Sequence, residues 1–423
     1  MARQMDRRSL WQTGLAATVF GSMAGGIAYA VEPDHDVIFI SDFDELWSTL
    51  DQRYCFFAEK RTDWNRVRDL YRPLALAAPS SEAFADIVGR VLSELYDPHT
   101  SLSNPPAGSQ RGPNSDLIVD WRNGQARITA IADDSVALEA GLSLDDAILA
   151  VDGRPIEALM RELTPKCLTR PDPAADAYAL NRAVAGVRGQ PRPYLIARNG
   201  GEAREVLLPI RQTAPRPDLE WRRLDDGTGY VVIRSFADDS VAESFDRALA
   251  DLRDAPGLII DVRYNGGGDT AVARPIMGRF ISETKPYARM RRRDGAGISE
   301  AWTEMVEPQG PFTYTGPVVV LTSHWSGSMA EGFPMGMRGL GRATVVGTPM
   351  MGLGAAVFPI RLDRTSLQAQ YSAEPVYDVR DRPRWLMRPD VEVADGEDIL
   401  AAGRRVLTAE IGRLNLSGSA ATS

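Results

Sequence analysis

Residues 258–269 read LIIDVRYNGGGD, and this stretch decides the fold of the C-terminal half of the chain. A short apolar run that ends in three consecutive glycines predicts a buried strand followed by a tight turn into a helix. The pattern repeats along the chain, with strands expected at 230–236, 318–321 and 344–346, and helices at 241–252, 271–281 and 329–340. Alternating strands and helices predict an α/β core with a largely parallel sheet.

Two loops of this core contain the residues that could take part in catalysis. Residues 264–269 and 323–328 each follow a strand, so both loops should lie at the carboxyl edge of the sheet, where ligands of parallel sheets bind. The glycines at 266–268 allow positive φ and bring backbone N–H groups close to a ligand, as an oxyanion hole requires. A tight strand-to-helix turn without a ligand is the alternative for this loop.

Ser328 stands where the second loop enters a helix. The helix dipole stabilises negative charge on a serine oxygen or on a neighbouring tetrahedral intermediate. Ser328-Met329-Ala330-Glu331 also fits the capping box, in which the hydroxyl only caps the helix. The sequence of this loop alone does not decide whether Ser328 is a nucleophile or a helix cap.

Composition narrows the classes of function. The chain has 423 residues, of which 44% are hydrophobic and 25% are charged, so it is globular and long enough for several domains. A net charge of −9 argues against nucleic acid as the main partner. Two cysteines, Cys55 and Cys167, are too few for a four-ligand zinc site, and they are expected either to pair or to be buried thiols. With no metal-ligand cluster and no phosphate-binding loop, we expect no cofactor and no metal.

The first thirty residues have the pattern of an export signal. Arg7-Arg8 precedes an apolar stretch rich in glycine and alanine, and Ala28-Tyr29-Ala30 is a small-x-small cleavage site. The apolar run is broken by glycines and falls short of the roughly 20 residues that a spanning helix needs. We therefore expect twin-arginine export, a mature chain that begins near Val31 without stable membrane insertion, and a periplasmic or secreted location.

The middle of the chain changes from a helical to a strand pattern. From residue 41 to 96 apolar residues recur at helical spacing, and from 115 to 210 short strands are expected. Within the second region, residues 134–153 read DSVALEAGLSLDDAILAVDG and resemble a PDZ domain in the order of helix, Ala-Gly-Leu turn, acidic pair and strand. PDZ domains bind extended peptides by strand addition and capture a terminal carboxylate. No glycine-rich loop is evident near residues 116–119.

The loops together with residues 341–347, GRATVVG, resemble the C-terminal-processing (tail-specific) serine peptidases and their tricorn-type relatives. The resemblance extends to Arg388-Pro389-Asp390 and the final helix, and it implies a multidomain α/β fold with a crotonase/Clp-protease-like core. The implied domains are a signal at 1–30, a helical domain at 31–104, a PDZ-like domain at 112–212, the peptidase core at 213–412 and a flexible tail at 413–423. The implied function is a serine-type endopeptidase that acts on peptides or unfolded proteins.

The same resemblance assigns the site. It places the nucleophile at Ser328 and the oxyanion hole at the N–H groups of Met329 and of a glycine, Gly267 or Gly268. His99, in Asp97-Pro98-His99-Thr100, matches the Asp-x-His-Thr motif in which the histidine of the tricorn-type branch is the general base. His324, four residues before Ser328, is the alternative base.

Two departures from the family pattern stand out. The position of the lysine base in the bacterial tail-specific branch is Leu353 here, and no lysine follows Lys285, which argues against a Ser-Lys dyad. The acid expected shortly before Pro389-Asp390 is replaced by Pro383. Asp381 is therefore the candidate third member, with Asp378 and Glu374 further upstream.

If no carboxylate reaches His99, the site would work as a Ser-His dyad or would have decayed. Two other functions stay open on the sequence. One is non-catalytic binding of a peptide or an apolar ligand on the same scaffold, and the other is hydrolysis of a non-peptide acyl substrate.

Overall fold

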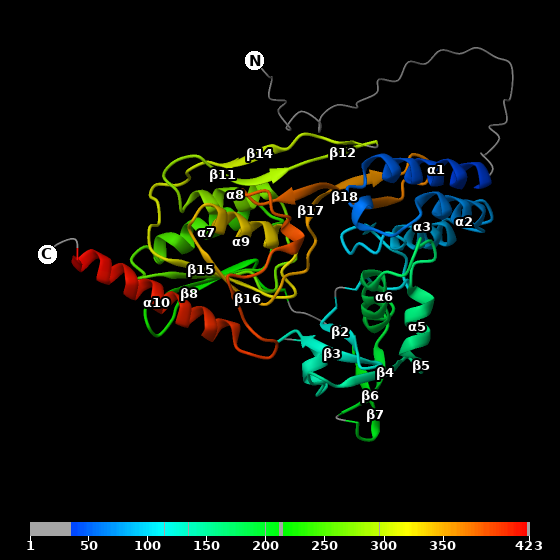
Figure 1. The fold of residues 1–423 in the computed structure, drawn as a ribbon, viewed down its shortest axis with the longest axis horizontal. Helices are drawn as coiled ribbons and strands as arrows, with labels where there is room; N and C mark the ends of the chain where they lie inside the picture. The colour runs from blue at the N-terminus through cyan, green and yellow to red at the C-terminus, as the bar shows by residue number, and fades with distance from the viewer. Residues whose placement is uncertain are drawn as a thin grey trace, which may run out of the picture.

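The structure is a computed structural model that describes residues 35–420, apart from residues 114, 134, 199, 211–214 and 296. The export signal predicted for residues 1–30 lies outside the described residues. Figure 1 shows a helical domain, an inserted sheet domain beneath it and an α/β core beside both. This arrangement confirms the predicted multidomain α/β fold. Among the described residues, no helix combines the length and apolarity needed to cross a membrane.

Three helices form the N-terminal domain: α1 (His35–Arg53), α2 (Trp64–Leu76) and α3 (Ser81–Ser93), with the short η1 (Phe57–Glu59) between the first two. Side chains of the preceding residues cap α2 and α3, since Asp63 accepts from the Arg66 N–H and Ser80 from the Ala83 N–H. The apolar faces of the helices share one core, which includes Phe43, Leu50 and Val88.

A second sheet, which the sequence pattern did not reveal, packs against the helical domain. Its strands are β1 (Ser101–Leu102), β11 (Lys285–Met290), β14 (Trp302–Val306), β17 (Ala355–Arg361) and β18 (Gln368–Tyr377). Ala355 and Tyr371 are buried in the same cluster as the helices, so residues far apart in the chain build one core. A small hairpin of β12 (Arg293–Asp294) and β13 (Gly297–Ile298) lies beside α1.

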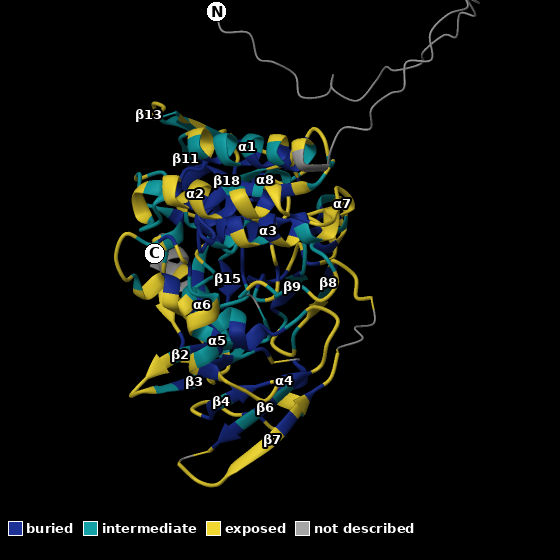
Figure 2. Ribbon diagram, turned by 90° about the vertical axis from the view of Figure 1, so that its right-hand side faces the viewer, coloured by how far each residue is buried: buried dark blue, intermediate teal, exposed yellow. Residues whose placement is uncertain are grey.

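The inserted domain contains a six-stranded antiparallel sheet with the order β2-β3-β4-β6-β7, and β5 pairs with β4. Its elements are β2 (Leu117–Arg122), β3 (Gln125–Ile131), α4 (Val136–Glu139), β4 (Ala147–Val151), β5 (Arg154–Pro155), α5 (Ile156–Leu163), α6 (Pro173–Ala185), β6 (Arg192–Ala197) and β7 (Ala203–Leu208). Helix α6 packs on β2. In Figure 2 the edge strand β7 is largely exposed, whereas β15 of the core is buried.

The core sheet has the order β19-β16-β15-β10-β9-β8, and its strands are parallel except for the β8–β9 pair. They are β8 (Leu219–Arg223), β9 (Gly229–Ile233), β10 (Leu258–Asp261), β15 (Val318–Thr322), β16 (Thr344–Gly347) and β19 (Val391–Glu392). Helices α7 (Ser240–Asp251), α8 (Thr270–Gly278) and α9 (Met329–Gly339) cover one face, and α10 (Ile399–Ala420) covers the other. The predicted strand-helix alternation is confirmed.

The tail predicted to be flexible from residue 413 is helical in the structure. Helix α10 continues to Ala420, because Leu407 anchors it on the sheet and neither Gly412 nor a proline stops it. The two cysteines are free thiols, and both belong to the buried cluster of the helical domain.

Candidate active site

The two loops predicted to face one another meet at the carboxyl edge of the sheet. Strands β10 and β15 are parallel neighbours in which Asp261 lies opposite Leu321, so the loops that follow begin side by side. The Gly327 N–H donates to the Asn265 carbonyl at 3.0 Å and joins the loops. Gly267 lies against the serine: a Cβ built on it would be 2.6 Å from the Ser328 Cβ and 3.0 Å from the Met329 nitrogen.

Ser328 does not cap the helix that it precedes. Its backbone has φ 55° and ψ −116°, and its side chain makes no capping hydrogen bond. The capping-box interpretation is therefore wrong for this serine. A non-glycine residue in this region costs about 1–3 kcal/mol and is kept only where the surroundings impose it. The sharp turn between Gly327 and Met329 is such a place, and it leaves the hydroxyl free for chemistry.

The backbone donors near Ser328 are not equivalent. Met329 contributes the first N–H of α9, and this N–H has no backbone partner among the described residues. The Gly267 N–H is already bound, because it donates to the Asn265 Oδ1 at 2.8 Å. Gly268, with φ 140°, lies against the backbone of Phe236, so even a methyl group would collide there. An oxyanion at Gly267 would thus have to replace the Asn265 amide oxygen.

A hydrogen-bonded turn after α3 holds His99. The Asp97 carboxylate accepts from the His99 N–H at 3.0 Å, from the Thr100 hydroxyl at 2.8 Å and from the Ser372 hydroxyl at 2.7 Å. Because Ser372 belongs to β18, Asp97 joins the turn to the sheet that packs against the helical domain. The sequence motif contains Asp97 but predicts no role for it. In the structure this carboxylate fixes the backbone of His99.

The His99 ring is buried and neutral at pH 7. Burial lowers its pKa from 6.5 to about 4; Asp97 and the Leu353 carbonyl oppose this change, and the Arg384 guanidinium adds to it. The Nδ1 atom has no hydrogen-bond partner among the described residues. The Leu353 backbone lies close enough to the ring to raise its pKa, and the Leu353 side chain lies beside Gly327. Leu353, the position of the missing lysine, therefore lies near both His99 and Gly327, the residue that precedes Ser328.

A buried ion pair between Glu331 and Arg384 holds the segment around Leu353 in place. The sequence analysis did not predict this pair. Glu331, fully buried, accepts from the Leu353 N–H at 2.8 Å, and its other oxygen lies 3.4 Å from the Arg384 Nε. Burial raises the pKa of Glu331 to about 7, against the effect of Arg384. Arg384 belongs to η2 (Arg384–Leu386) and donates to the Ala355 carbonyl at 3.1 Å. The pair thus fixes residues 353–355 next to His99.

The structure does not bring Asp381 to His99. The Asp381 carboxylate pairs with Arg291 at 2.7 Å and lies 3.6 Å from Arg289, both on or beside β11. Asp381 lies in a turn with φ 65°, which directs its side chain toward these arginines. The other upstream acids are also paired, Asp378 with Arg382 and Glu374 with Arg292. Asp97 contacts His99 through the backbone N–H and not through the ring.

His324 has a partner of its own. Its Nε2 lies 2.7 Å from the Asp395 Oδ1, at a cavity of about 710 Å³ between the core and the inserted domain. In the same place, the Trp325 Nε1–H donates to the Ser115 carbonyl at 2.7 Å, and the Tyr264 hydroxyl accepts from the Asp133 N–H at 3.0 Å. Both site loops thus contact the inserted domain.

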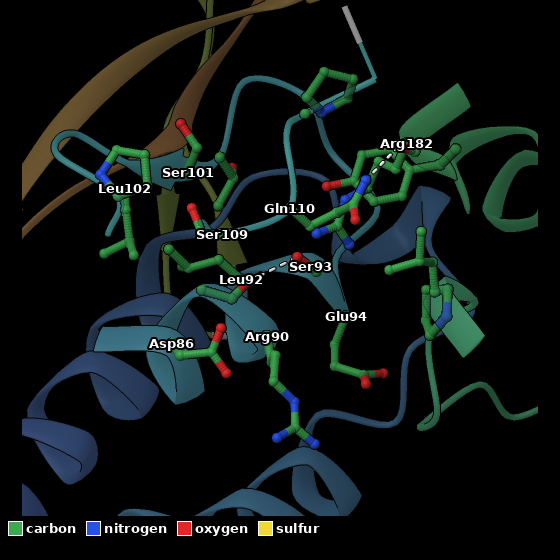
Figure 3. Close-up of a pocket in the computed structure, with 18 of the residues that line it drawn as sticks. Asp86, Arg90, Leu92, Ser93, Glu94, Ser101, Leu102, Ser109, Gln110 and Arg182 are labelled. Carbon is green, nitrogen blue, oxygen red and sulfur yellow. Dashed lines mark hydrogen bonds between the residues drawn. The ribbon is translucent and has the colours of Figure 1, made fainter. Parts of the chain in front are cut away.

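A second cavity, of about 680 Å³, opens between α3, the segment 98–112 and the α5–α6 region (Figure 3). Glu94 on its wall accepts from the Tyr71 hydroxyl at 2.6 Å and from the N–H groups of Lys166 and Cys167 at 3.0 and 2.9 Å. This carboxylate joins the helical domain to the inserted domain. Ser328 and His99 are not among the described residues that line the cavity.

No group of acidic, histidine or cysteine side chains in the described chain has the arrangement of a metal site.

Comparisons with known proteins place these features in context. The model of peptidase family S41 matches residues 227–393, and that of the tricorn protease C1 domain matches residues 39–93. The carboxy-terminal processing protease CtpB of Bacillus subtilis is 24% identical over 62% of this chain and 53% of its own length. The carboxyl-terminal-processing protease of Synechocystis is 24% identical over 80% of this chain and 77% of its own length.

One solved structure shows the same fold at low identity. The structure of mature CPAF complexed with lactacystin has a TM-score of 0.60, with 15% identity over 90% of this chain and 97% of that one.

Proposed function

Since the chain belongs to peptidase family S41, we propose that it is a serine peptidase that cleaves peptide bonds with Ser328 as nucleophile and His99 as general base. The observation that carries this proposal is the conformation of Ser328. The residue is held at φ 55° between Gly267 and the first N–H of α9, with no capping role to explain it. Peptides and unfolded proteins are the proposed substrates.

The proposed reaction has two steps, formation of an acyl-enzyme and its hydrolysis. The Ser328 Oγ attacks the peptide carbonyl carbon while His99 takes the hydroxyl proton, and the Met329 N–H holds the oxygen that becomes negative. His99 then gives the proton to the leaving amine, the C–N bond breaks and an acyl-enzyme remains. Water, deprotonated by His99, hydrolyses the ester and restores Ser328.

The histidine is oriented without a third acidic residue. In this proposal the Leu353 carbonyl takes the orienting role, and the Glu331–Arg384 pair holds Leu353 in place. A neutral imidazole is the form that accepts a proton, so the low pKa of His99 keeps the base available across neutral pH. The same low pKa makes His99 a weak base, which predicts modest rather than fast turnover.

Location and domain roles are proposed from the sequence. The twin-arginine pattern supports export to the periplasm or outside the cell. The inserted domain has the element order of the PDZ-like sequence pattern, and we propose that it assists in presenting substrate.

One observation favours the alternative of a non-catalytic binding protein on the same scaffold. The Gly267 N–H is bound by Asn265, so one oxyanion donor is occupied until a ligand replaces the amide oxygen. A protein that binds peptides without cleaving them would keep this bond. The same experiment separates the two functions.

The test is mass spectrometry of a peptide library, with free and amidated carboxyl termini, after incubation with the mature protein and with its Ser328→Ala and His99→Ala variants. The proposal expects cleavage by the wild type alone. Cleavage by Ser328→Ala, or binding without cleavage by all three, would overturn it. Because Ser328 makes no capping bond, its loss should change stability by less than about 0.5 kcal/mol, whereas Ser80→Ala removes a real cap and should cost about 1 kcal/mol.

A further inference from the structure

Strand β2 is an edge strand of the inserted domain. Among the described strands it pairs only with β3, and its free edge faces helix α6. An extended peptide that adds to such an edge bonds the outward N–H and C=O groups of alternate residues. In β2 these groups belong to Leu117, Val119 and Trp121. A peptide strand that fills the groove would therefore have to pair with Leu117 and Val119 as well as with Trp121.

Side chains of the same domain already bind both residues. The Asn181 carboxamide, from α6, accepts from the Val119 N–H at 2.9 Å and donates to the Val119 carbonyl at 2.9 Å, as a neighbouring strand would. The Ser115 hydroxyl accepts from the Leu117 N–H at 3.3 Å and donates to the Leu117 carbonyl at 3.0 Å. The four outward backbone groups of Leu117 and Val119 are thus satisfied.

Helix α6 is held firmly in this position. Leu180 and Val184 are buried with Leu117 and Val119 in the core of the domain. The Arg111 N–H, from the segment before β2, donates to the Gly186 carbonyl at the end of α6 at 2.9 Å. The packing of α6 therefore holds Asn181 in position against Val119.

The start of the groove is unsuited to a free carboxyl terminus. Asp116 directly precedes β2, and its carboxylate binds Arg192 through two hydrogen bonds of 2.7 and 3.0 Å. The Arg192 guanidinium, which is buried, is thereby neutralised by an acid of the same domain. An incoming carboxylate would meet Asp116 at a cation that is already neutralised, while Arg111, which acts on the same pair, donates its side chain to the Val187 carbonyl.

We propose that Asn181 closes the strand-addition groove of the inserted domain, so that an extended peptide enters only by displacing this side chain from Val119. The proposal rests on the proposed function in that it takes the occupant to be a substrate peptide. A peptide gains little backbone hydrogen bonding in the closed groove, because each bond that it makes to Val119 replaces one already made by Asn181. Peptide selection by the closed domain is therefore weak.

The experiment measures peptide binding in a full-length mature chain that carries Ser328→Ala, so that no cleavage interferes. The probes are fluorescein-labelled decapeptides with apolar last residues and free or amidated carboxyl termini, followed by fluorescence anisotropy. Adding Asn181→Ala frees both Val119 groups and should tighten binding about tenfold or more. Asn181→Asp keeps the size but loses the donor to the Val119 carbonyl and should have a smaller effect in the same direction.

Asp176→Ala is the matched control, because Asp176 lies exposed on the same helix. It should leave binding unchanged. Amide hydrogen exchange locates the effect: the Val119 amide should lose protection in Asn181→Ala and regain it with peptide, while β6 stays protected and shows that the domain is folded.

Equal peptide affinity with and without Asn181, or a gain in affinity without renewed protection at Val119, would overturn the proposal. Because binding is measured without turnover, failure of the peptidase function would not produce either result.

Discussion

We expect acid to lower the free energy of unfolding of this protein because His99 becomes protonated on unfolding. The substitution His99→Gln should remove this part of the acid sensitivity. The folded protein holds this imidazole buried and neutral, with a pKa of about 4 against 6.5 for the ordinary group. Between these two pH values the unfolded chain binds a proton at His99 and the folded chain does not. Stability is therefore lost as the pH falls from about 6.5 to about 4, and the loss is complete below the folded pKa.

The size of the effect follows from the difference of the two pKa values. Each pKa unit corresponds to 1.36 kcal/mol, so the change from 6.5 to about 4 gives roughly 3 kcal/mol. The charged groups that act on the ring are Asp97, which favours its protonation, and Arg384, which opposes it with Glu331 as its partner. Burial is the largest cause, so salt should change the effect little.

The assay is urea unfolding at pH 7, 5.5 and 4 for the wild type and for His99→Gln, which removes the titrating group and keeps a neutral polar side chain. Carboxylates other than Asp97 titrate alike in both proteins, so the difference between the two reports on His99 together with its neighbour Asp97. We expect the wild type to lose roughly 3 kcal/mol more than the variant between pH 7 and 4. Equal losses, or an imidazole pKa above 6 by NMR, would refute the assignment of a buried neutral base.

Three substitutions test other parts of the site. Gly267→Ala places a Cβ 2.6 Å from the Ser328 Cβ and should lower kcat at least a hundredfold, whereas Gly266→Ala, whose Cβ meets nothing within 4 Å, should be tolerated; equal activities would contradict the geometry. Arg384→Met leaves Glu331 buried without its partner and should cost about 3–5 kcal/mol of unfolding free energy, part of which Glu331→Gln in the same chain restores. The double variant should also shift the acid limb of the activity profile to higher pH, because a positive charge near the base is gone; an unmoved limb would speak against Arg384. His324→Gln should keep the wild-type cleavage rate, and a loss as large as that of His99→Gln would make His324 the base.

The meeting of the two loops could be predicted because it depends on local rules. A strand followed by Gly266-Gly267-Gly268 and a strand followed by Ser328 place both loops at one edge of a parallel sheet, whatever surrounds them. The role of Ser328 was ambiguous because Ser-x-x-Glu describes both a cap and this site. Only the three-dimensional structure shows that the serine side chain is uncapped and that Glu331 points to Leu353.

The parts that escaped prediction depend on contacts between distant segments. Arg384 follows Pro383, where an acid was sought, and its partner Glu331 lies far earlier in the chain. The sheet that contains β17 and β18 could not be predicted from its own sequence, because its apolar residues are buried only against the N-terminal helices, with which they share a core. The Asn181 contact with Val119 likewise needs the packing of α6 on β2.

The central claim is that Ser328 is a nucleophile activated by His99. The most direct test is to label the folded protein at pH 7 with a fluorophosphonate probe, which attaches to an activated serine hydroxyl with loss of fluoride, and to map the adduct by mass spectrometry. The account predicts one adduct, on Ser328, absent in Ser328→Ala and formed at least a hundredfold more slowly in His99→Gln. No adduct on Ser328 in the wild type, or labelling that proceeds unchanged without His99, would contradict it.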